Sequence, residues 1–373
     1  MNGNERQGKK PSRGFNPPLE STPWLGRQET IMKTDRETMV QNLYNYKDSY
    51  TLESPLYKTS IIAFMNSMLG EDLSETGCIT ALAIFGDQDQ GKAMISAQQK
   101  GILAGLDEAC LLLDNYRNHL RYHRAEKNGR PIQDGDPLEE NEDPVLYIEG
   151  RIITILEVER TILNILQRMS GIATEVYEQQ EKIRACGSPS RLAATRKLQW
   201  GRMDKKAFIV GGGLSHRRGL YNTMMIKDTE IDFWHFLEDG DIDPDSETAR
   251  IEWILGSIAH CWRQREKSTG LIVEVQTPKE AGIIAHRLKN LQNGHYYPCS
   301  IMLDNFSPDL IIQTLDKCRE DGTYDWTLFE SSGNIRNASI LDYARTGVDV
   351  ISTGTPTHST NVLDIHMKVM MER

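Results

Sequence analysis

After Gly187-Ser188-Pro189 the chain repeats one pattern, in which a short apolar run ends in polar residues and a helical stretch often follows. The apolar runs are RLAATRK, AFIVGGG, TMMIKD, GLIVEV, SIMLDNF, TLFESSG and VDVISTG. The helical stretches include PKEAGIIAHRLKNL, SPDLIIQTLDKCRED, RNASILDYARTG and HSTNVLDIHMKVMME. Alternating buried strands and helices are typical of a parallel sheet. The pattern favours an α/β barrel, with an open doubly wound sheet as the alternative, and in both architectures the chemistry lies at the carboxyl ends of the strands.

The part of the chain before these repeats is organised differently, and 373 residues are enough for two domains. Residues 1 to about 40 are rich in Gly, Pro, Asn and charges, which predicts a disordered tail. Residues 41–150 mix a helix candidate at 60–69, the strand-like ITALAIFG and an acidic, turn-rich segment at 130–144 that we interpret as an exposed loop. From Leu156 onward, apolar residues at helical spacing predict a long amphipathic helix. A second acidic segment, EDGDIDPDSE at 238–247, is typical of an insertion before a helix.

Basic and imidazole side chains are concentrated in the middle of a chain whose formal net charge is -10. They are Arg160, Arg196, Lys197, His216, Arg217, Arg218 and Lys227, and most fall at or just after an apolar run. Two carboxylates, Glu274 and Asp304, also end apolar runs, where an unpaired charge is costly. Arginine forks suit carboxylates and phosphates, and carboxylates can hold a Mg²⁺–diphosphate complex. The pattern predicts a pocket for a polyanionic, metal-carrying small molecule, and the diffuse acidity elsewhere argues against nucleic acid.

Two glycine-containing loops are candidate phosphate sites. SSGN at 331–334 and STGT at 352–355 each close an apolar run and precede a predicted helix. Glycine lets the backbone approach a phosphate, and a helix N-terminus offers free N–H groups. Adjacent strands of a barrel commonly share one phosphate site. The candidate phosphate-binding residues are Ser332, Gly333, Asn334, Thr353, Gly354 and Thr355.

Other classes of protein lack support in the sequence. The six cysteines are scattered without a CxxC or a Cys/His cluster, which argues against a disulfide framework and a zinc site. No apolar run reaches the roughly 18–20 residues of a membrane span, and the first residues lack the apolar core of a secretory signal. We therefore expect a reduced, cytoplasmic protein that acts on small molecules.

The ordered set of motifs resembles the quinolinate phosphoribosyltransferases over roughly residues 55–370. The motifs that carry the resemblance are EDLSETGCITA (71–81), ERTILNILQRMSGIAT (159–174), TRK (195–197), GGGLSHRRGLYNTMMIKD (211–228), VEV (273–275), MLDNFSP (302–308) and GVDVISTGTPTHSTNVLDI (347–365). Their number and order make the resemblance far more specific than a single glycine motif.

The resemblance implies a fold and an assembly. The fold is an N-terminal α/β sandwich domain followed by an open α/β barrel, with a C-terminal helix that returns to the first domain. The expected segments are a tail at 1–40, the sandwich domain at 41–158, the barrel at 159–350 and the returning segment at 351–373. Members of the family form homodimers or larger homo-oligomers with active sites near the subunit contacts.

The resemblance also implies a reaction, in which quinolinate and 5-phosphoribosyl-1-diphosphate give nicotinate mononucleotide, diphosphate and CO₂, with Mg²⁺ as cofactor. Arg160, Arg196 and Arg217 would clamp the two carboxylates of quinolinate, together with Thr195 of the same TRK motif, and Arg160 would act across the dimer. Lys197, Lys227 and His216 would line the ribose–diphosphate side. Glu274 and Asp304 would bind ribose hydroxyls or the metal complex, and the two glycine loops would hold the 5-phosphate.

The sequence departs from the family pattern around the expected pyridine-binding end. The departures are Ala194, Leu198-Gln199-Trp200-Gly201, Thr229-Glu230, Gln276 and Asn334. Trp200 would narrow or restack the pocket, and Glu230 would add negative charge near it. Two alternatives therefore stay open beside quinolinate transfer: the same transfer to another aromatic or heteroaromatic acid, and a non-catalytic paralogue that binds a phosphorylated ligand or serves as an assembly subunit. Asparagine at position 334 tolerates a left-handed backbone, so that loop is expected to keep its shape.

Overall fold

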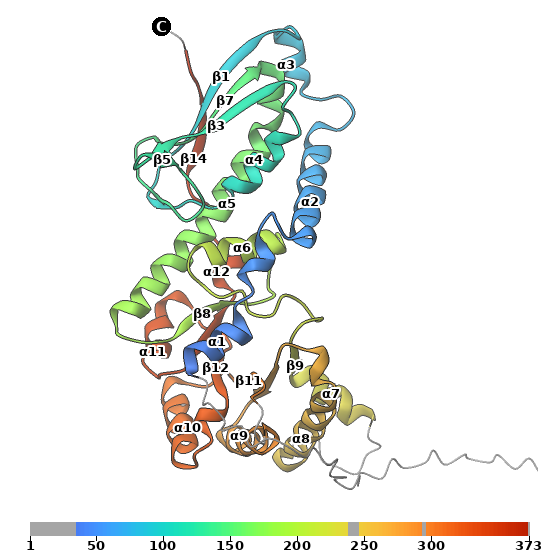
Figure 1. Cartoon of the computed structure of the whole chain (residues 1–373), viewed down its shortest axis with the longest axis vertical. Coiled ribbons are helices and arrows are strands. Elements are labelled where there is room, and N and C mark those ends of the chain that lie inside the picture. Colours follow the sequence, from blue (N-terminus) through green and yellow to red (C-terminus); the bar gives the residue numbers. More distant parts are fainter. Residues whose placement is uncertain (1–34, 238–245, 293–295, 372–373) are drawn as a thin grey trace, which may run out of the picture. The chain divides into compact units, whose positions relative to one another are not determined.

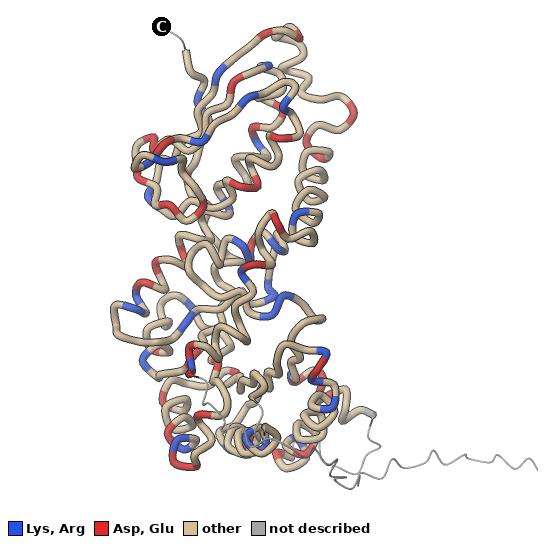
Figure 2. Tube along the Cα trace, in the orientation of Figure 1, with Lys and Arg blue, Asp and Glu red and all other residues tan. Residues whose placement is uncertain are grey.

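The computed structural model describes residues 35–237, 246–292 and 296–371. Most of the predicted tail and most of the acidic segment at 238–247 lie outside these residues. Within the described residues, no helix is both long and apolar enough to span a membrane. Acidic and basic residues are interspersed along the whole described trace rather than separated into two halves (Figure 2).

A six-stranded, all-parallel sheet forms the barrel, in the order β8-β13-β12-β11-β10-β9 (Figure 1). Its strands are β8 (Arg191–Ala194), β9 (Met224–Ile226), β10 (Leu271–Val275), β11 (Cys299–Asp304), β12 (Leu328–Ser332) and β13 (Val350–Thr353). Strands β8 and β9 lie at the two ends of this order and do not pair with each other, so the barrel is open. The predicted α/β class with an open barrel is confirmed.

Helices connect the strands, as the alternating pattern predicted. They are α6 (Arg202–Val210), α7 (Asp228–Leu237), α8 (Glu247–Arg263), α9 (Pro278–Gln292), α10 (Pro308–Glu320), α11 (Ile340–Ala344) and α12 (Thr355–His358). One predicted strand was wrong, because the AFIV of AFIVGGG belongs to α6. Phe208 of this helix is fully buried. A Cβ added to Gly213 would lie only 2.2 Å from a carbon of the Phe208 ring, which is too close for any side chain. Gly213 is therefore required by the packing of α6, Gly211 by the close approach of the Ala173 carbonyl, and Gly212 by its φ of +90°.

A separate four-stranded antiparallel sheet has the order β14-β1-β7-β3. Its strands are β1 (Gln90–Ala97), β3 (Leu120–Arg124), β7 (Asp143–Arg151) and β14 (Ile365–Val369). The helices before and among them are α2 (Pro55–Leu73), α3 (Ile79–Ile84) and α4 (Leu106–Asp114). Two short two-stranded ribbons, β2 (Gly101–Ile102) with β6 (Pro137–Leu138) and β4 (Glu126–Lys127) with β5 (Arg130–Pro131), accompany the sheet.

Two local predictions for this part were wrong. ITALAIFG, expected as a strand, forms α3, in which Ile79 and Ile84 are exposed and Ala81 alone is buried. The C-terminal segment, expected as a helix, forms the short α12 and then β14, which pairs with β1. Pairing with β1 gives this segment ladder hydrogen bonds to an existing strand, whereas an isolated helix of this length is only marginally stable.

The long helix α5 (Ile152–Ala185) was predicted from Leu156 and starts four residues earlier. It contacts β7 and β14 of the antiparallel sheet, and it also contacts α6, α11 and α12 of the barrel. The expected domain boundary at residue 159 falls inside this helix, so one helix is shared by both halves of the fold.

The first described helix, α1 (Arg36–Tyr44), lies partly in the segment that was expected to be a tail up to residue 40. Asp35 caps it by accepting a hydrogen bond from the Thr38 N–H. Its apolar face joins barrel strands in one buried cluster, which contains Met39, Val40, Leu43, Tyr44, Ala193, Leu214, Ile272, Met302, Leu328 and Val350. The helix therefore closes the interior of the barrel, and the expectation of disorder was wrong for residues 36–40.

Candidate active site

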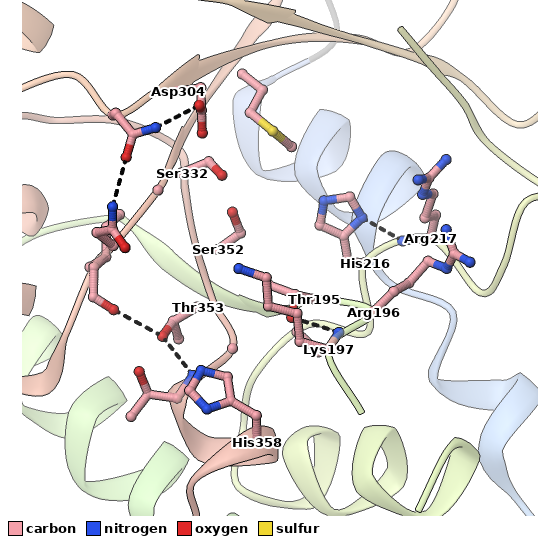
Figure 3. Close-up of a pocket in the computed structure, with 18 of the residues that line it drawn as sticks. Thr195, Arg196, Lys197, His216, Arg217, Asp304, Ser332, Ser352, Thr353 and His358 are labelled. Carbon is pink, nitrogen blue, oxygen red and sulfur yellow. Dashed lines mark hydrogen bonds between the residues drawn. The ribbon is translucent and has the colours of Figure 1, made fainter. Parts of the chain in front are cut away.

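A cavity of ≈ 760 Å³ opens at the carboxyl ends of the barrel strands (Figure 3). It is lined by most of the side chains predicted from sequence: Thr195, Arg196, Lys197, His216, Arg217, Lys227, Asp304, Ser332, Gly333, Asn334, Thr353, Gly354 and Thr355. These residues come from segments that are far apart in the chain. The parallel sheet brings them together because all its strands end at one edge.

One side of the cavity, the cationic side, carries Arg196 and Arg217. Figure 3 shows Arg196 and Arg217 close to each other beside His216, whereas Asp304 and Ser332 lie on the opposite side. Arg217 is 9% exposed, and burial together with the neighbouring Arg196 lowers its pKa. Two guanidinium groups in this position repel each other unless an anion lies between or beside them. The cationic side therefore suits a ligand that carries carboxylates.

Lys205 of α6 also lines this side, and the sequence analysis did not identify it. Lys205 is 1% exposed, and its amine donates to the carbonyl of Ser215 at 2.7 Å and to that of Arg217. Burial and the charges of Arg196, Arg217 and Arg202 lower the pKa of Lys205 to about 7. No carboxylate of the described residues forms an ion pair with it. In the sequence it is one of two adjacent lysines, and nothing there distinguishes it from Lys206.

Lys206 points elsewhere, and its ion pairs explain why it is not part of the cavity. Its amine lies 2.8 Å from a carboxylate oxygen of Asp134, 2.9 Å from one of Glu108 and 3.2 Å from one of Asp107. These carboxylates raise the pKa of Lys206 against the effect of burial. The two adjacent lysines thus have opposite environments, which only the fold decides.

His216 lies in a left-handed turn, with φ of +55°. Its backbone N–H donates to the Tyr44 carbonyl at 2.9 Å, and the Arg217 N–H donates to its Nδ1 at 2.6 Å. Its Nε2 lies 3.1 Å from Oε1 of the fully buried Glu330. A positive φ is unfavourable for a residue with a side chain, so these contacts are what hold the turn.

The two glycine loops face the cavity from β12 and β13. A Cβ on Gly333, whose φ is +91°, would lie 2.3 Å from Oδ1 of Asn305, so this position requires glycine. Asn334 adopts φ of +51° and donates to the same Asn305 oxygen at 3.2 Å, as expected for a loop that keeps its shape. The helix expected after each loop is short: a 3-10 turn follows the first and the four-residue α12 follows the second. Phosphate binding would thus depend on loop amides and hydroxyls more than on a helix dipole.

Three of the predicted residues lie outside the cavity lining. Glu274 is 3% exposed and lies behind Lys227, whose amine is 3.2 Å from its Oε2. Burial raises the pKa of Glu274, an effect that Lys227 opposes and Asp304 reinforces. Arg160 is exposed on α5 away from the cavity. Arg218 donates to the Ser49 hydroxyl at 3.1 Å and stacks over the ring of Tyr46.

Two other cationic or titratable lining residues were missed. Arg336 follows the first glycine loop at the cavity wall, and His358 ends α12 beside the second. Arg336 is exposed, and no described carboxylate forms an ion pair with it. The other site residues were identified because they lie at or just after an apolar run. Arg336 and His358 lie outside such runs, so their sequence positions gave no signal.

The departures from the family pattern mostly fall away from the cavity. Trp200 was expected to narrow it, but its ring packs 5.4 Å from that of Phe64, and the Arg168 guanidinium lies 5.2 Å from its centre. Glu230 accepts a hydrogen bond from the Lys227 N–H at 3.1 Å, where it caps the start of α7. Neither residue lines the cavity, whereas Ala194 does. The expectation that Trp200 reshapes the pocket was wrong because its neighbours come from α2 and α5.

The described residues contain no group of three His, Cys, Asp or Glu side chains that could hold a metal ion by themselves. Asp304 lines the cavity with its carboxylate and accepts a hydrogen bond from the Asn305 amide at 2.7 Å. A single carboxylate of this kind suits a metal that takes most of its oxygen ligands from a bound substrate and water.

Comparisons with known proteins agree with this geometry. Residues 79–170 match the quinolinate phosphoribosyl transferase N-terminal domain, and residues 172–239 and 249–368 match the C-terminal domain of the same family. A protein of Methanothermobacter thermautotrophicus, described as a probable nicotinate-nucleotide pyrophosphorylase (carboxylating), is 33% identical over 78% of this chain and 92% of its own. Quinolinate phosphoribosyltransferase (decarboxylating) 1b of Nicotiana tabacum is 26% identical over 88% of each chain.

Among solved structures, NadC from Streptococcus pyogenes is 26% identical, with a TM-score of 0.68, and the match covers 84% of this chain and 99% of that one. The nicotinate-nucleotide pyrophosphorylase of Francisella tularensis has the same TM-score at 24% identity, over 84% of this chain and 96% of the other, which supports the fold. Both domains of the family are present in the family's order, and the C-terminal one holds a cavity with the charges that the motifs predicted. The chain belongs to the quinolinate phosphoribosyltransferase family.

Proposed function

We propose that this protein transfers the phosphoribosyl group of 5-phosphoribosyl-1-diphosphate to quinolinate and releases diphosphate and CO₂, as a pentosyltransferase. The observation that carries the proposal is the division of one cavity into two sides. Arg196, Arg217 and Lys205 lie on one side, and the loops at Ser332–Asn334 and Thr353–Thr355 contribute backbone and hydroxyl groups elsewhere in the lining. A dicarboxylate and a phosphorylated sugar diphosphate require this combination. The names of the family's relatives supply the identity of the ring acid.

The cationic side would bind and orient the ring acid. Arg196 and Arg217 present planar forks that pair with carboxylates in bidentate geometry, and the buried Lys205 adds a point charge beneath them. Holding both carboxylates aims the ring nitrogen at the anomeric carbon of the sugar, which removes orientational entropy from the reaction.

The opposite side would stabilise the leaving diphosphate. As the bond from the anomeric carbon to the diphosphate oxygen breaks, negative charge grows on the leaving group and positive charge on the ribose. Lys197 and Lys227 both line the cavity and supply fixed positive charge for the departing group. The Asp304 carboxylate faces the same space and suits the ribose hydroxyls or a cation on the diphosphate.

Decarboxylation then needs no side-chain nucleophile. Once the ring nitrogen carries the ribose, the ring is cationic and can accept the electron pair of the adjacent carbon–carboxylate bond. CO₂ leaves, and a proton takes its place on the ring carbon. The role of the protein in this step is to keep the charged ring in place.

We propose Mg²⁺ as the cofactor, carried by the diphosphate of the substrate. Mg²⁺ characteristically binds through one or two carboxylates together with substrate phosphates and water, which fits the single carboxylate of Asp304 at the cavity wall. When bound, the ion would neutralise charge on the leaving diphosphate. Glu274 is an unsuitable direct ligand, because it is buried behind Lys227 and already paired with it. Asp304→Asn should raise the Mg²⁺ concentration needed for half-maximal rate, whereas an unchanged requirement would exclude this assignment.

We propose a homodimer in which Arg160 acts in the cavity of the second copy. Arg160 is exposed on α5 and does not line its own cavity. Near it, Leu156 on α5 and Ile79, Leu82 and Ile84 on the contacting α3 are large apolar side chains at 36–70% exposure. Such a face is suited to burial against another subunit. Mixing inactive Arg160→Ala and Lys227→Ala chains should restore activity in mixed dimers, and no recovery on mixing would exclude the shared site.

The described cysteines are all unpaired, which supports our proposal of a reducing, cytoplasmic location. Localising the tagged full-length chain in its own cells tests this.

An acceptor screen tests the proposed function directly. The protein is mixed with 5-phosphoribosyl-1-diphosphate, Mg²⁺ and a panel of ring acids, and both diphosphate and CO₂ are measured. Quinolinate should release both. Diphosphate release with another acid but not with quinolinate would replace the acceptor, and release with no acid despite ligand binding would indicate a non-catalytic relative.

A further inference from the structure

The helix α1 precedes the residues that match the family's two domains, yet one of its side chains reaches the underside of the active site. Tyr44 is fully buried, and its hydroxyl donates to Oε2 of Glu330 at 2.7 Å. Glu330 lies on β12 and is fully buried as well. These two residues are 286 positions apart in the sequence, so their contact depends on α1 closing the barrel.

The other oxygen of Glu330 connects this pair to the cavity. Oε1 lies 3.1 Å from Nε2 of His216, a residue that lines the cavity. Because Nδ1 of His216 accepts the hydrogen bond from the Arg217 N–H, we assign the ring proton to Nε2, which donates it to Glu330. The orientation and tautomer of the His216 ring are therefore set jointly by the Arg217 N–H at Nδ1 and the Glu330 carboxylate at Nε2.

The charge of Glu330 depends on its few neighbours. Burial raises the pKa of Glu330, whereas the charge of His216 when its ring is protonated and the hydrogen bonds from His216, Ser352 and Tyr44 lower it, and the net direction is downward. The groups around the carboxylate are Tyr44 from α1, His216 with Arg217 from the turn, Ser352 from β13 and, near Tyr44, Asp349. Tyr44 thus contributes one of the hydrogen bonds that keep Glu330 ionised.

The backbone of Tyr44 acts on the same turn. Its carbonyl accepts the His216 N–H at 2.9 Å and the Ser215 hydroxyl at 3.0 Å. The ring of Tyr44 meets the ring of His216 edge to face, with 5.0 Å between centres. From the other side, the Lys205 amine holds the carbonyls of Ser215 and Arg217. The left-handed conformation at His216 is thus held between α1 and α6.

We propose that Tyr44 is a positioning residue of the active site, which acts through Glu330 and through the turn at Ser215–Arg217 to present His216 and Arg217 to the substrate. Helix α1 is then part of the catalytic apparatus and not only a closure of the barrel. The activity part of this proposal rests on the proposed function, whereas the structural part, the state of the His216 ring, does not.

The test uses the full-length chain with Tyr44→Phe, which removes the hydroxyl and keeps the ring and the carbonyl. We expect kcat/KM to fall about tenfold, because a hydrogen bond to an ionised carboxylate in a buried network is lost. The acid limb of its pH profile should move to higher pH, because Glu330 loses a hydrogen bond that favours its ionised form. The matched control is Tyr57→Phe, which removes an equally buried hydroxyl from Glu108 at 2.9 Å, outside the cavity, and should leave kcat/KM and the pH profile unchanged.

A double-mutant cycle identifies the route of the effect. If Tyr44 acts through Glu330, Tyr44→Phe in a Glu330→Gln background should cost little more activity than Glu330→Gln alone. If the loss of activity in the double variant equals the product of the losses in the two single variants, Tyr44 does not act through Glu330 and the proposal is overturned.

Nitrogen-15 NMR of histidine-labelled protein measures the protonation of the two ring nitrogens of His216 and does not depend on turnover. The His216 signals are assigned by their loss in His216→Gln. The wild type should show an unprotonated Nδ1 and a protonated Nε2, and Tyr44→Phe should change this pattern or its pH dependence. If the His216 signals of the two proteins are identical across pH, the proposal fails even when the enzyme is active. If the expected change appears but no ring acid is turned over, the proposed function fails while the structural inference stands.

Discussion

The Lys227 amine lies 3.2 Å from Oε2 of Glu274, and the pair joins the ends of the neighbouring strands β9 and β10. Lys227 is 40% exposed and faces the cavity, whereas Glu274 is buried behind it. The carboxylate therefore holds the lysine in place for a bound anion.

Replacing Lys227 with Ala should reduce turnover by about 10²–10³-fold, because a fixed charge that stabilises the leaving group is lost. Steady-state kinetics with quinolinate and 5-phosphoribosyl-1-diphosphate measures the effect on turnover, and thermal unfolding measures the separate stability cost of leaving the buried Glu274 without its partner. Lys279→Ala is the control, since Lys279 forms a comparable 2.7 Å pair with Glu247 at the surface. An unchanged rate in Lys227→Ala would remove this residue from the site.

The amine of Lys205 should make acceptor binding depend on pH. Its pKa is about 7, and a bound dianion beside it would raise that value. Affinity should then be greatest below pH 7 and decline as pH rises above 7, by up to about tenfold per pH unit. Titration calorimetry in buffers of different ionisation enthalpy should show proton uptake on binding at pH 8.

Two variants separate the charge of Lys205 from its other contacts. Lys205→Arg keeps a permanent charge and should bind without proton uptake, and Lys205→Met should bind weakly at every pH. A wild-type affinity that is constant from pH 6 to 9 would contradict a titrating Lys205.

Trp200→Thr should leave the ranking of acceptor acids unchanged, because the ring packs against Phe64 and Arg168 and not against the cavity. It should lower the free energy of unfolding by about 2 kcal/mol, since Trp200 is only half-buried and a full core deletion costs more. Urea unfolding and the acceptor screen measure the two effects. A new acceptor preference would place Trp200 against the bound ring.

Arg36→Ala should weaken the attachment of α1 to the barrel. The guanidinium forms a two-pronged pair with Asp349, in which Nε lies 2.7 Å from Oδ1, and it stacks 3.8 Å from the centre of the Tyr324 ring. Asp349 is 9% exposed, so losing its partner should cost about 2–3 kcal/mol of unfolding free energy. The control Arg345→Ala breaks an exposed pair with Asp342 and should cost less than about 1 kcal/mol. Equal losses would show that α1 contributes little to stability.

Much of the barrel and of its active site could be read from local pattern. The runs that end at Ala194, Ile226, Val275, Asp304, Ser332 and Thr353 are the six barrel strands. Polar residues at these strand ends meet in one cavity because the carboxyl ends of parallel strands lie at the same edge of the sheet. A residue's place at the end of an apolar run is therefore enough to predict that it lies near the other residues of the site. The same reasoning failed for ITALAIFG, AFIVGGG and the C-terminal segment, where a short apolar run is compatible with either a helix or a strand.

By itself, the sequence determined the α/β class, the family and the set of charged residues that surround the cavity, because each depends on periodicity or on order along the chain. Only the tertiary structure decided which of two adjacent lysines is the unpaired one, that Trp200 turns toward α2, that Glu274 lies behind Lys227, and that α1 brings Tyr44 beneath His216. The environment of a buried charge or ring is set by whichever distant segment packs against it. Those contacts join residues up to hundreds of positions apart and leave no mark in local sequence.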